Sequence, residues 1–386
     1  MDFFDGRNYR VNKILLSAIG QWPYQSSKTN YIITIVITTI TCSQLLTKLC
    51  SMFSYIHDME IVIECLTPIM IDISGITKIM NSMLCVNEMR TLLDQIQADF
   101  RSLRNSGDIE ILQKYADSGR KFSIIYIYTL YIVMVIFMLT PLPALILHVA
   151  NETRPMLHRV EYYVDIDKYY FPILIHGYLT VLICVTSIVA TDAMLVIFVQ
   201  HACGMFIITG SRIKRALQGE LTDANLSVVE DKAYRNMIQC VHDHRAAIRL
   251  VNLIEAAYSK YILFHTGLNM IAISITGVGA VTKLNDPSEL FKLIAVSWAL
   301  LFHLCLECLN AQKLMDYSGY LLHTSLVNLN WYDASPRTKK LVLFMMMKTH
   351  SPCVLTAGGM FVLCMETYAT IVKTAVSYFT FLRSAQ

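Results

Sequence analysis

Hydrophobic residues along the chain gather into seven long stretches, separated by segments in which polar residues dominate. The stretches cover residues 31–50, 61–85, 122–150, 171–208, 258–281, 290–310 and 353–382. A helix rises about 1.5 Å per residue, so about 20 apolar residues cross the roughly 30 Å hydrocarbon core of a bilayer. The pattern predicts an all-α integral membrane protein with seven transmembrane helices and no separate soluble domain.

The fourth stretch, 171–208, is too long for a simple span, and the last stretch runs for about 30 residues, or roughly 45 Å as a straight helix. The segments 209–257 and 311–351 are charged but keep apolar residues at helical spacing. We therefore expect the fourth helix to project into a bundle of cytoplasmic helical extensions. Ser351 and Pro352 should interrupt that bundle before the last span.

Lys and Arg residues are distributed unevenly among the polar segments. The N-terminal arm and every second segment after it hold most of them, whereas the other segments and the C-terminal tail hold five. Because basic residues concentrate in cytoplasmic loops, we expect the N-terminus inside and the C-terminus outside the cell. This orientation is opposite to that of a G-protein-coupled receptor.

Composition supports a membrane location and gives no sign of an enzyme. The chain is 55% hydrophobic and 16% charged, against about 25% charged residues in a soluble domain. The net charge of +3 is spread over several loops, so we expect no nucleic-acid partner. The sequence contains no HExxH, GxSxG or GxxxxGK[ST] signature, and we expect no cofactor. The first stretch lacks a cleavage site and should remain as a transmembrane helix.

Ionisable residues inside the predicted spans are functional candidates because their burial in lipid is costly. They are Glu64, Asp72, Asp192, Glu307, Glu366 and Lys373. We favour a structural role for Asp72 and Asp192. Glu366 and Lys373 lie seven residues apart on one helix face, and two interpretations stay open, an ion pair or contact with a neighbouring span, and a polar path.

Two other groups of residues have simple interpretations. His303, Cys305 and Cys308 lie close in sequence, but they offer too few ligands for zinc, and we expect no metal site. All eleven cysteines should be free thiols.

The sequon at Asn151 falls in an outside loop and is a candidate for glycosylation, whereas the sequon at Asn225 falls inside.

Proline residues in the second and third stretches predict kinks that would open a cavity near the outer face. They are Pro68, Pro141 and Pro143. Adaptable apolar side chains gather in the same outer halves, together with a serine. The predicted pocket residues are Met70, Ser74, Met134, Phe137, Met138, Tyr178, Leu182 and Trp298.

Several motifs resemble those of the insect odorant receptors, and the resemblance covers nearly the whole chain. The sequences Leu-Thr-Ala-Gly-Gly at 355–359 and Lys-Thr-Ala-Val-Ser-Tyr-Phe-Thr-Phe-Leu-Arg at 373–383 look like the C-terminal signature of that family. Leu16 and the run Gly-Gln-Trp-Pro at 20–23 are similar to its N-terminal pattern. Trp331, Pro336 and the run at 340–347 are similar to its inner segment.

The resemblance implies a ligand-specific subunit of an odorant-gated cation channel. Residues 1–30 would form a cytoplasmic arm with an amphipathic helix, 31–208 the pocket bundle, 209–352 the anchor with two further spans, and 353–386 the pore-lining helix. The implied partners are a shared co-receptor in a heterotetramer, a volatile odorant, the permeating ions Na⁺, K⁺ and Ca²⁺, and membrane lipid. The implied location is the plasma membrane of olfactory sensory neurons.

The resemblance also places the pore and gate on the last helix. Carried over by position, the residues concerned are Thr370, Thr374, Tyr378, Phe381, Ser384 and Ala385. Phe381 is bulky where an aliphatic gate residue is typical, and Arg383 adds charge near the mouth. Both departures fit a tuning subunit that needs a co-receptor. The alternatives are a gustatory-type channel, a metabotropic seven-span receptor and a secondary transporter.

Overall fold

The structure, a computed structural model, describes residues 3–141, 156–218, 226–284 and 286–384 of the chain. Helices account for nearly all of it. Their bounds are η1 Phe3–Asp5, α1 Arg10–Ala18, α2 Ser27–Ser54, α3 Met59–Leu84, α4 Val86–Leu103, α5 Ile109–Leu139, α7 Tyr170–Gln218, α8 Leu226–Thr282, α9 Pro287–Asp316, η3 Tyr317–Leu321, α10 Leu322–Val327, η4 Trp331–Asp333, α11 Pro336–Thr349 and α12 Met365–Ser384. Two short strands, β1 Thr356–Ala357 and β2 Phe361–Val362, pair antiparallel before the last helix.

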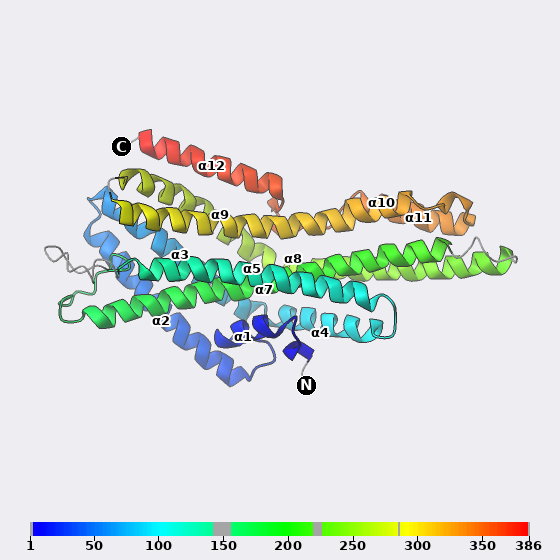
Figure 1. Cartoon of the computed structure of the whole chain (residues 1–386), viewed down its shortest axis with the longest axis horizontal. Helices are drawn as coiled ribbons and strands as arrows, with labels where there is room; N and C mark the ends of the chain where they lie inside the picture. The colour runs from blue at the N-terminus through cyan, green and yellow to red at the C-terminus, as the bar shows by residue number, and fades with distance from the viewer. Residues whose placement is uncertain (1–2, 142–155, 219–225, 285, 385–386) are drawn as a thin grey trace.

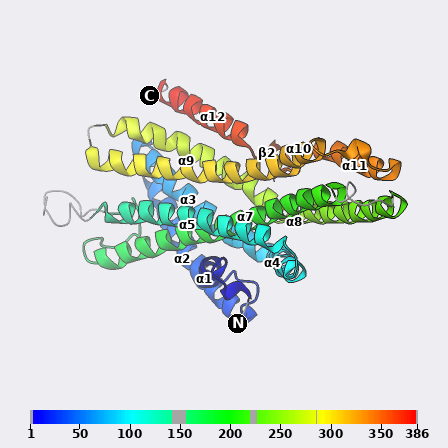
Figure 2. The ribbon, with the colours of Figure 1, turned by 45° about the vertical axis from the view of Figure 1, so that its right-hand side comes forward.

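The molecule is a long bundle in which α7 and α8 run most of its length, and α9 is continued towards the other end by η3 and α10 (Figures 1 and 2). α5 packs along α7, and α3 packs against both α7 and α8. α12 lies along one half of the bundle, whereas α10 and α11 occupy the other end. The long helices therefore connect the half of the molecule that holds α12 with the end that holds α10 and α11.

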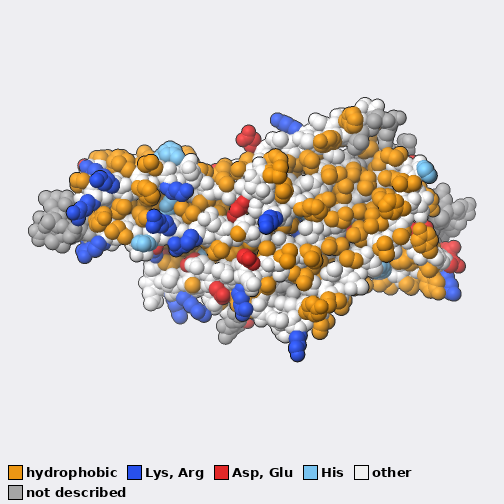
Figure 3. Space-filling model, turned by 180° about the vertical axis from the view of Figure 1, so that it is seen from behind, with side chains coloured by type: hydrophobic (Ala, Val, Ile, Leu, Met, Phe, Trp, Pro, Cys, Tyr) orange, Lys and Arg blue, Asp and Glu red, His pale blue; other side chains and the backbone are white. Residues whose placement is uncertain are grey.

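We call the half that holds α12 and the end of α8 at Thr282 the apolar half. On the face in Figure 3, hydrophobic side chains cover this half, whereas Lys and Arg gather towards the opposite end, which holds α10 and α11. Large apolar side chains such as Ile32 on α2, Ile132 on α5 and Phe171 on α7 are exposed there. A continuous apolar surface of this kind is what a lipid bilayer would cover.

Among the described residues, five helical segments are long and apolar enough to cross a membrane. They are Ser27–Ser54, Ile109–Leu139, Tyr170–Leu217, Lys232–Thr282 and Glu289–Val327. The second and last predicted spans correspond to α3 and α12. α3 contains Glu60, Glu64, Asp72 and Lys78, and α12 contains Glu366 and Lys373, so charged residues interrupt the apolar run of each helix.

The helices continue well past the apolar half, as the overlong fourth stretch predicts. α7 has 49 residues and α8 has 57, so they extend for roughly 75 and 85 Å. Their extensions pack on α10 and α11 around an apolar core that includes Phe206, Met237 and Val342. Arg212 joins the extensions by pairing with Asp108 at 2.8 Å and with Asp243 at 2.5 Å.

The start of the last span differs from the predicted helix beginning at residue 353. A β-hairpin occupies residues 356–362, and α12 begins only at Met365. Gly358 and Gly359 adopt φ values of +61° and +73°, which favour glycine and suit a turn. The backbone nitrogen of Thr356 also donates to the carboxylate of Glu255 at 2.9 Å. The 20 residues of α12 then match the roughly 30 Å of a bilayer core.

Candidate ligand cavity and its buried polar floor

A cavity of about 980 Å³ opens in the apolar half of the molecule. Its walls come from α2, α3, α5, α7, α8 and α9, with residues 156–167 beside its entrance. Apolar side chains form most of the wall, among them Ile71, Leu130, Val185, Leu268 and Val296. A cavity of this size and character suits a small, mainly apolar molecule.

Four of the eight predicted pocket residues line this cavity. They are Met70, Ser74, Met134 and Phe137. Pro68, which predicts a kink in the second span, also lines it, although α3 continues as a helix through this residue. The second and third predicted spans do therefore face a common space.

The other four predicted pocket residues do not line the cavity, so their assignment to it is wrong. The Tyr178 hydroxyl donates to the Met138 carbonyl at 3.0 Å, and Tyr178 packs in a separate apolar cluster with Leu157 and Tyr170. Leu182 is 41% exposed and Trp298 is 49% exposed. Both belong to the outward surface of the bundle, which a pattern of apolar residues alone does not separate from the cavity wall.

The deep end of the cavity is polar. Lys48, Asp72, Ser74, His265, Asn269 and His303 all line it. Lys48 pairs with Asp72 at 2.7 Å, and both side chains are almost fully buried. The Asn269 amide nitrogen is buried and has no hydrogen-bond partner among the described residues. An unpartnered buried donor in a cavity wall is free to bind an acceptor on a ligand.

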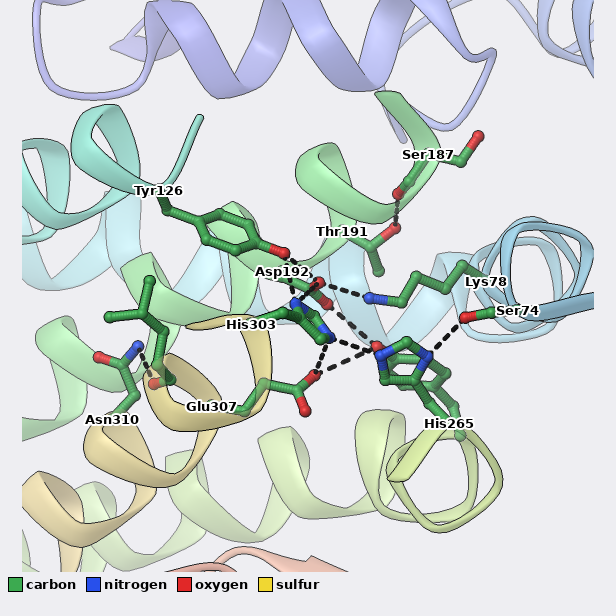
Figure 4. A network of polar contacts seen from close by, with 12 residues as sticks. Ser74, Lys78, Tyr126, Ser187, Thr191, Asp192, His265, His303, Glu307 and Asn310 are labelled. Carbon is green, nitrogen blue, oxygen red and sulfur yellow. Dashed lines mark hydrogen bonds and ion pairs between the residues drawn. The ribbon is translucent and has the colours of Figure 1, made fainter. Parts of the chain in front are cut away.

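A second buried ion pair lies beneath this polar floor, between Lys78 on α3 and Asp192 on α7 (Figure 4). The Asp192 carboxylate also accepts hydrogen bonds from Tyr126 at 2.7 Å and from Tyr261 at 3.0 Å. Lys78 further lies over the Tyr261 ring, 5.0 Å from its centroid. Because a buried charge is tolerated only when it is paired and hydrogen-bonded, this cluster holds α3, α5, α7 and α8 in one arrangement.

Two histidines extend the cluster towards the cavity (Figure 4). The Nε2 atoms of His265 and His303 lie 2.5 Å apart. Nδ1 of His265 lies 2.5 Å from the Ser74 hydroxyl, and Nδ1 of His303 lies 2.7 Å from the Tyr126 hydroxyl. Glu307, one turn after His303 on α9, is also buried, and its Oε1 lies 3.4 Å from His303 Nε2.

The cavity entrance is ringed by charged groups. Arg159 pairs with Glu64 at 2.5 Å, and Lys283 pairs with Glu60 at 2.8 Å and with Glu64 at 3.0 Å. The hydrogen bond from Lys283 to Glu60 raises the pKa of this lysine, and the bond to Glu64 acts in the same direction. These pairs connect the start of α3, the 156–167 segment and the end of α8 around the opening.

The cavity entrance also contains His158, whose ring lies 5.3 Å from that of Phe137. Its Nε2 is enclosed and has no hydrogen-bond partner among the described residues. Burial, with the charges of Lys48 and Lys292 adding to it, holds the pKa of His158 well below its usual range. This histidine is therefore neutral at pH 7.

The predicted pore and gate residues lie on α12, largely on its exposed side. Thr370, Tyr378, Phe381 and Ser384 are exposed and Thr374 is half-buried, whereas Ala385 falls outside the described residues. Glu366 and Lys373 are also exposed and form no ion pair with each other or with another described residue. The interpretation of these two charges as an internal ion pair is therefore wrong. Asn151 lies outside the described residues.

The family model for the 7tm odorant receptors matches residues 28–376 of this chain. The chain belongs to that family. The match runs from the start of α2 into α12, so it includes α3, α5, α7, α8 and α9, the first part of α12 and the walls of the cavity.

Individual relatives agree with this assignment. Odorant receptor 9a of Drosophila melanogaster is 25% identical over 58% of this chain and 54% of its own length. The odorant receptor coreceptor of Aedes aegypti is 22% identical over 37% of this chain and 30% of its own length. The chain thus matches about half the length of the first of these relatives and less of the second.

A solved structure shows the same fold over the whole chain. It is the insect olfactory receptor OR5 from Machilis hrabei in complex with eugenol, which matches with a TM-score of 0.78. The alignment covers 98% of this odorant-receptor family member and 97% of OR5, at 15% sequence identity. The seven-helix architecture of the predicted fold class is therefore confirmed, and its all-α character holds apart from the short β-hairpin.

Sequence reasoning missed several buried polar residues of this receptor-family chain. Lys48 and Lys78 pair with Asp72 and Asp192, although only the two aspartates were predicted as intramembrane charges. The sequence does place one lysine inside each of the first two predicted spans. Such lysines indicate buried ion pairs, because each can neutralise an aspartate on a neighbouring helix. His265 and Asn269 gave no such signal, since a single polar residue in a span is common.

Proposed function

We propose that this chain is the ligand-specific subunit of a heteromeric odorant-gated cation channel. A volatile, mainly apolar odorant would enter between the charged groups at the entrance and bind in the 980 Å³ cavity. Burial of apolar surface would supply most of the affinity, at about 25 cal/mol per Å². The unpartnered Asn269 amide favours a ligand that also carries one hydrogen-bond acceptor.

The main support for coupling between ligand binding and the proposed pore is that α8 both lines the cavity and packs against α12. His265, Asn269 and Ala272 on α8 line the cavity. About one and a half turns after Ala272, the same helix packs against α12, where the absence of a side chain at Gly277 admits the Phe379 ring. A ligand that shifts α8 would therefore move α12 without any intermediate element.

In the proposed channel, α12 of each subunit lines a central pore. The exposed side of α12 is polar along Glu366, Thr370 and Lys373, which suits a path for hydrated cations. Phe381 and Ser384, with Tyr378 one turn below, would form the narrow outer end together with Ala385. Ligand binding would favour the state in which these ends move apart and the constriction becomes wet.

The partner we propose is the common odorant-receptor co-receptor, in a heterotetramer in the plasma membrane of olfactory sensory neurons. Similarity to the coreceptor of Aedes aegypti supports a shared mode of assembly. The Lys and Arg side chains near α10 and α11 favour that end as cytoplasmic, with the N-terminus inside and the C-terminus outside. Na⁺, K⁺ and Ca²⁺ would permeate.

Whole-cell recording tests this proposal directly. Cells would express the chain alone, the co-receptor alone, or both, and would receive a broad panel of volatile compounds. We expect odorant-evoked cation current beyond that of the co-receptor alone only when both chains are present. Current from this chain alone would contradict the need for a co-receptor. Absence of any response, with surface delivery of both chains shown, would overturn the proposed function.

The orientation has its own test in the same cells. Epitope tags at the two termini would be stained before and after permeabilisation. We expect the C-terminal tag to be accessible in intact cells and the N-terminal tag only after permeabilisation. The reverse pattern would contradict the proposed topology and would favour a metabotropic receptor.

A further inference from the structure

The histidine pair beneath the cavity forms part of a compact set of potential metal ligands (Figure 4). His265 comes from α8, and His303 and Glu307 come from successive turns of α9. One nitrogen of each histidine and one carboxylate oxygen of Glu307 all lie within 4.8 Å of one another. The three residues are each at most 7% exposed, and both histidines line the cavity.

Neighbouring hydroxyl groups direct the lone pair of His303 towards this set. The Tyr126 hydroxyl donates its single proton to Asp192 at 2.7 Å, so its oxygen accepts a hydrogen bond from Nδ1 of His303, also at 2.7 Å. A neutral His303 then carries its proton on Nδ1 and presents an unprotonated Nε2. Metal-bound histidines are typically held in this way, by a second polar group at the nitrogen that faces away from the metal.

His265 faces the same space from the other side. Its Nδ1 lies against the Ser74 hydroxyl on α3, and its Nε2 faces Nε2 of His303. Two imidazole nitrogens that face each other at close range are joined either by a proton on one of them or by a cation between them. A coordinating metal ion would separate the two nitrogens to about 3.3 Å, given metal–nitrogen distances of 2.0–2.1 Å.

No lysine or arginine pairs with Glu307 among the described residues. Lys78 is already paired with Asp192. Oε1 of Glu307 lies 3.4 Å from the Tyr261 hydroxyl, but that hydroxyl is closer to Asp192, at 3.0 Å. Oε2 of Glu307 is buried with no hydrogen-bond partner among the described residues. A buried carboxyl group in this position is either protonated or placed beside a cation.

We propose that His265, His303 and Glu307 bind a transition-metal cation of the Zn²⁺ type. Two imidazoles and one carboxylate are a preferred ligand set for Zn²⁺, which takes four ligands in a tetrahedron. Because both histidines line the cavity wall, the fourth position faces the cavity and holds water or a small lone-pair donor. The site ties α8 to α9 directly below the space that we assign to the odorant.

Metal binding by the purified full-length chain tests this site without any channel recording. The chain would carry a tag without histidines, be stripped with a chelator, and then be titrated with Zn²⁺ or Co²⁺. We expect about one metal ion per chain by elemental analysis after desalting. We also expect the Co²⁺ form to show the intense visible absorption of a tetrahedral site.

Two variants and a control assign the ligands. Glu307→Gln preserves the shape of the side chain, and His265→Ala removes one nitrogen, so both should lose most of the bound metal and the Co²⁺ absorption. His176→Ala is the control, because His176 lies outside this set and bonds to Tyr162 and Ser43. It should retain both signals. Size-exclusion profiles would establish that each variant is folded.

The opposite results would overturn the site. A wild-type chain that is folded but retains no Zn²⁺ and shows no tetrahedral Co²⁺ spectrum would mean that a shared proton, and not a metal, joins the two histidines. Equal metal content in wild type and Glu307→Gln would place any bound metal elsewhere. Both outcomes stand whether or not the chain responds to odorants.

Discussion

At the scale of single residues, the cavity combines an extensive apolar wall with a few polar groups of defined position. Asn269 is the clearest of these, because its amide nitrogen is buried, lies in a cavity-lining residue and has no partner among the described residues. In an interior where polar groups are generally satisfied, such a donor is informative about ligand chemistry. It favours oxygen-bearing odorants over pure hydrocarbons.

Replacement of Asn269 by leucine should therefore discriminate between ligands. One lost hydrogen bond is worth about 0.5–1.5 kcal/mol, so an agonist with an acceptor oxygen should need roughly 3- to 10-fold higher concentration. A hydrocarbon of the same shape should be unaffected or improved. Concentration–response curves of evoked current measure this, with exposed Asn87→Leu as the control. Equal shifts for both ligand types would contradict the role of Asn269.

The enclosed His158 predicts a dependence of stability on pH. Burial lowers the pKa of His158, so below about pH 6.5 the unfolded chain takes up a proton that the folded chain resists. The stability contributed by neutral His158 is therefore present above that pH and is lost as the pH falls. Thermal melting of purified protein between pH 7.5 and 5 should show a smaller loss for His158→Phe than for wild type. Parallel curves for the two proteins would contradict this assignment.

At the scale of helices, buried ion pairs hold the apolar half together. Lys48 on α2 pairs with Asp72 on α3, and Lys78 on α3 pairs with Asp192 on α7. Each pair fixes the rotation and depth of two helices relative to each other, because sliding either helix would leave a charge unpaired in a water-poor interior. The ion pairs therefore also fix the positions of the cavity-lining side chains on α3 and α7, since both helices contribute to the wall.

Removal of one partner should be far more damaging than removal of both. Lys78→Met leaves the Asp192 carboxylate buried without its cation, which should cost about 3–5 kcal/mol and reduce surface delivery. The double variant Lys78→Met with Asp192→Asn should recover part of that loss. Surface biotinylation and thermal melting measure it, with the exposed Lys260→Met as control. A double variant worse than Lys78→Met would contradict the pairing.

The β-hairpin before α12 docks on one face of α8. Gly358 donates its backbone nitrogen to the Ser259 carbonyl at 2.9 Å, and an added Cβ at this residue would lie 2.5 Å from a Leu263 carbon. Gly359, with a similar positive φ, faces open space. The hairpin therefore sets where α12 begins, and its fit depends on one of the two glycines more than on the other.

The two glycines provide a matched comparison. Gly358→Ala should destabilise the chain more than Gly359→Ala, because both incur backbone strain of about 1 kcal/mol or more but only the first also collides with Leu263. Melting temperatures of the purified variants measure the difference. Equal losses would show that the close packing of the hairpin on α8 is unimportant.

The sequence predicted the fold more fully than the site, for physical reasons. Long apolar stretches and the basic residues between them follow directly from the demands of a bilayer, and the helices appear where they predict. The run that includes Gly358 and Gly359 looked helical because its neighbours are apolar, whereas the hairpin depends on a tertiary contact with Glu255. Trp298 was misplaced because lipid-facing and cavity-facing positions share the same residue types.

At the scale of the whole molecule, α8 and α9 connect the cavity to α12 on one side and to the basic end on the other. α8 contacts the hairpin through Glu255 and Ser259, lines the cavity through His265 and Ala272, and supports α12 at Gly277. The cavity wall and the support of α12 thus share one helix. If a ligand acts on α12 through α8, filling the cavity should impair the ligand response and leave ion selectivity unchanged.

The most direct measurement is the odorant concentration–response of cells that express the co-receptor with Ala272→Leu. Ala272 is 2% exposed and lines the cavity, so leucine would occupy space that the odorant needs. We predict at least a tenfold shift to higher concentration, about 1.4 kcal/mol, with unchanged ion selectivity and unchanged response for the exposed Ala98→Leu. An Ala272→Leu channel that reaches the surface and responds to odorants like wild type would contradict the claim that this cavity is the odorant site.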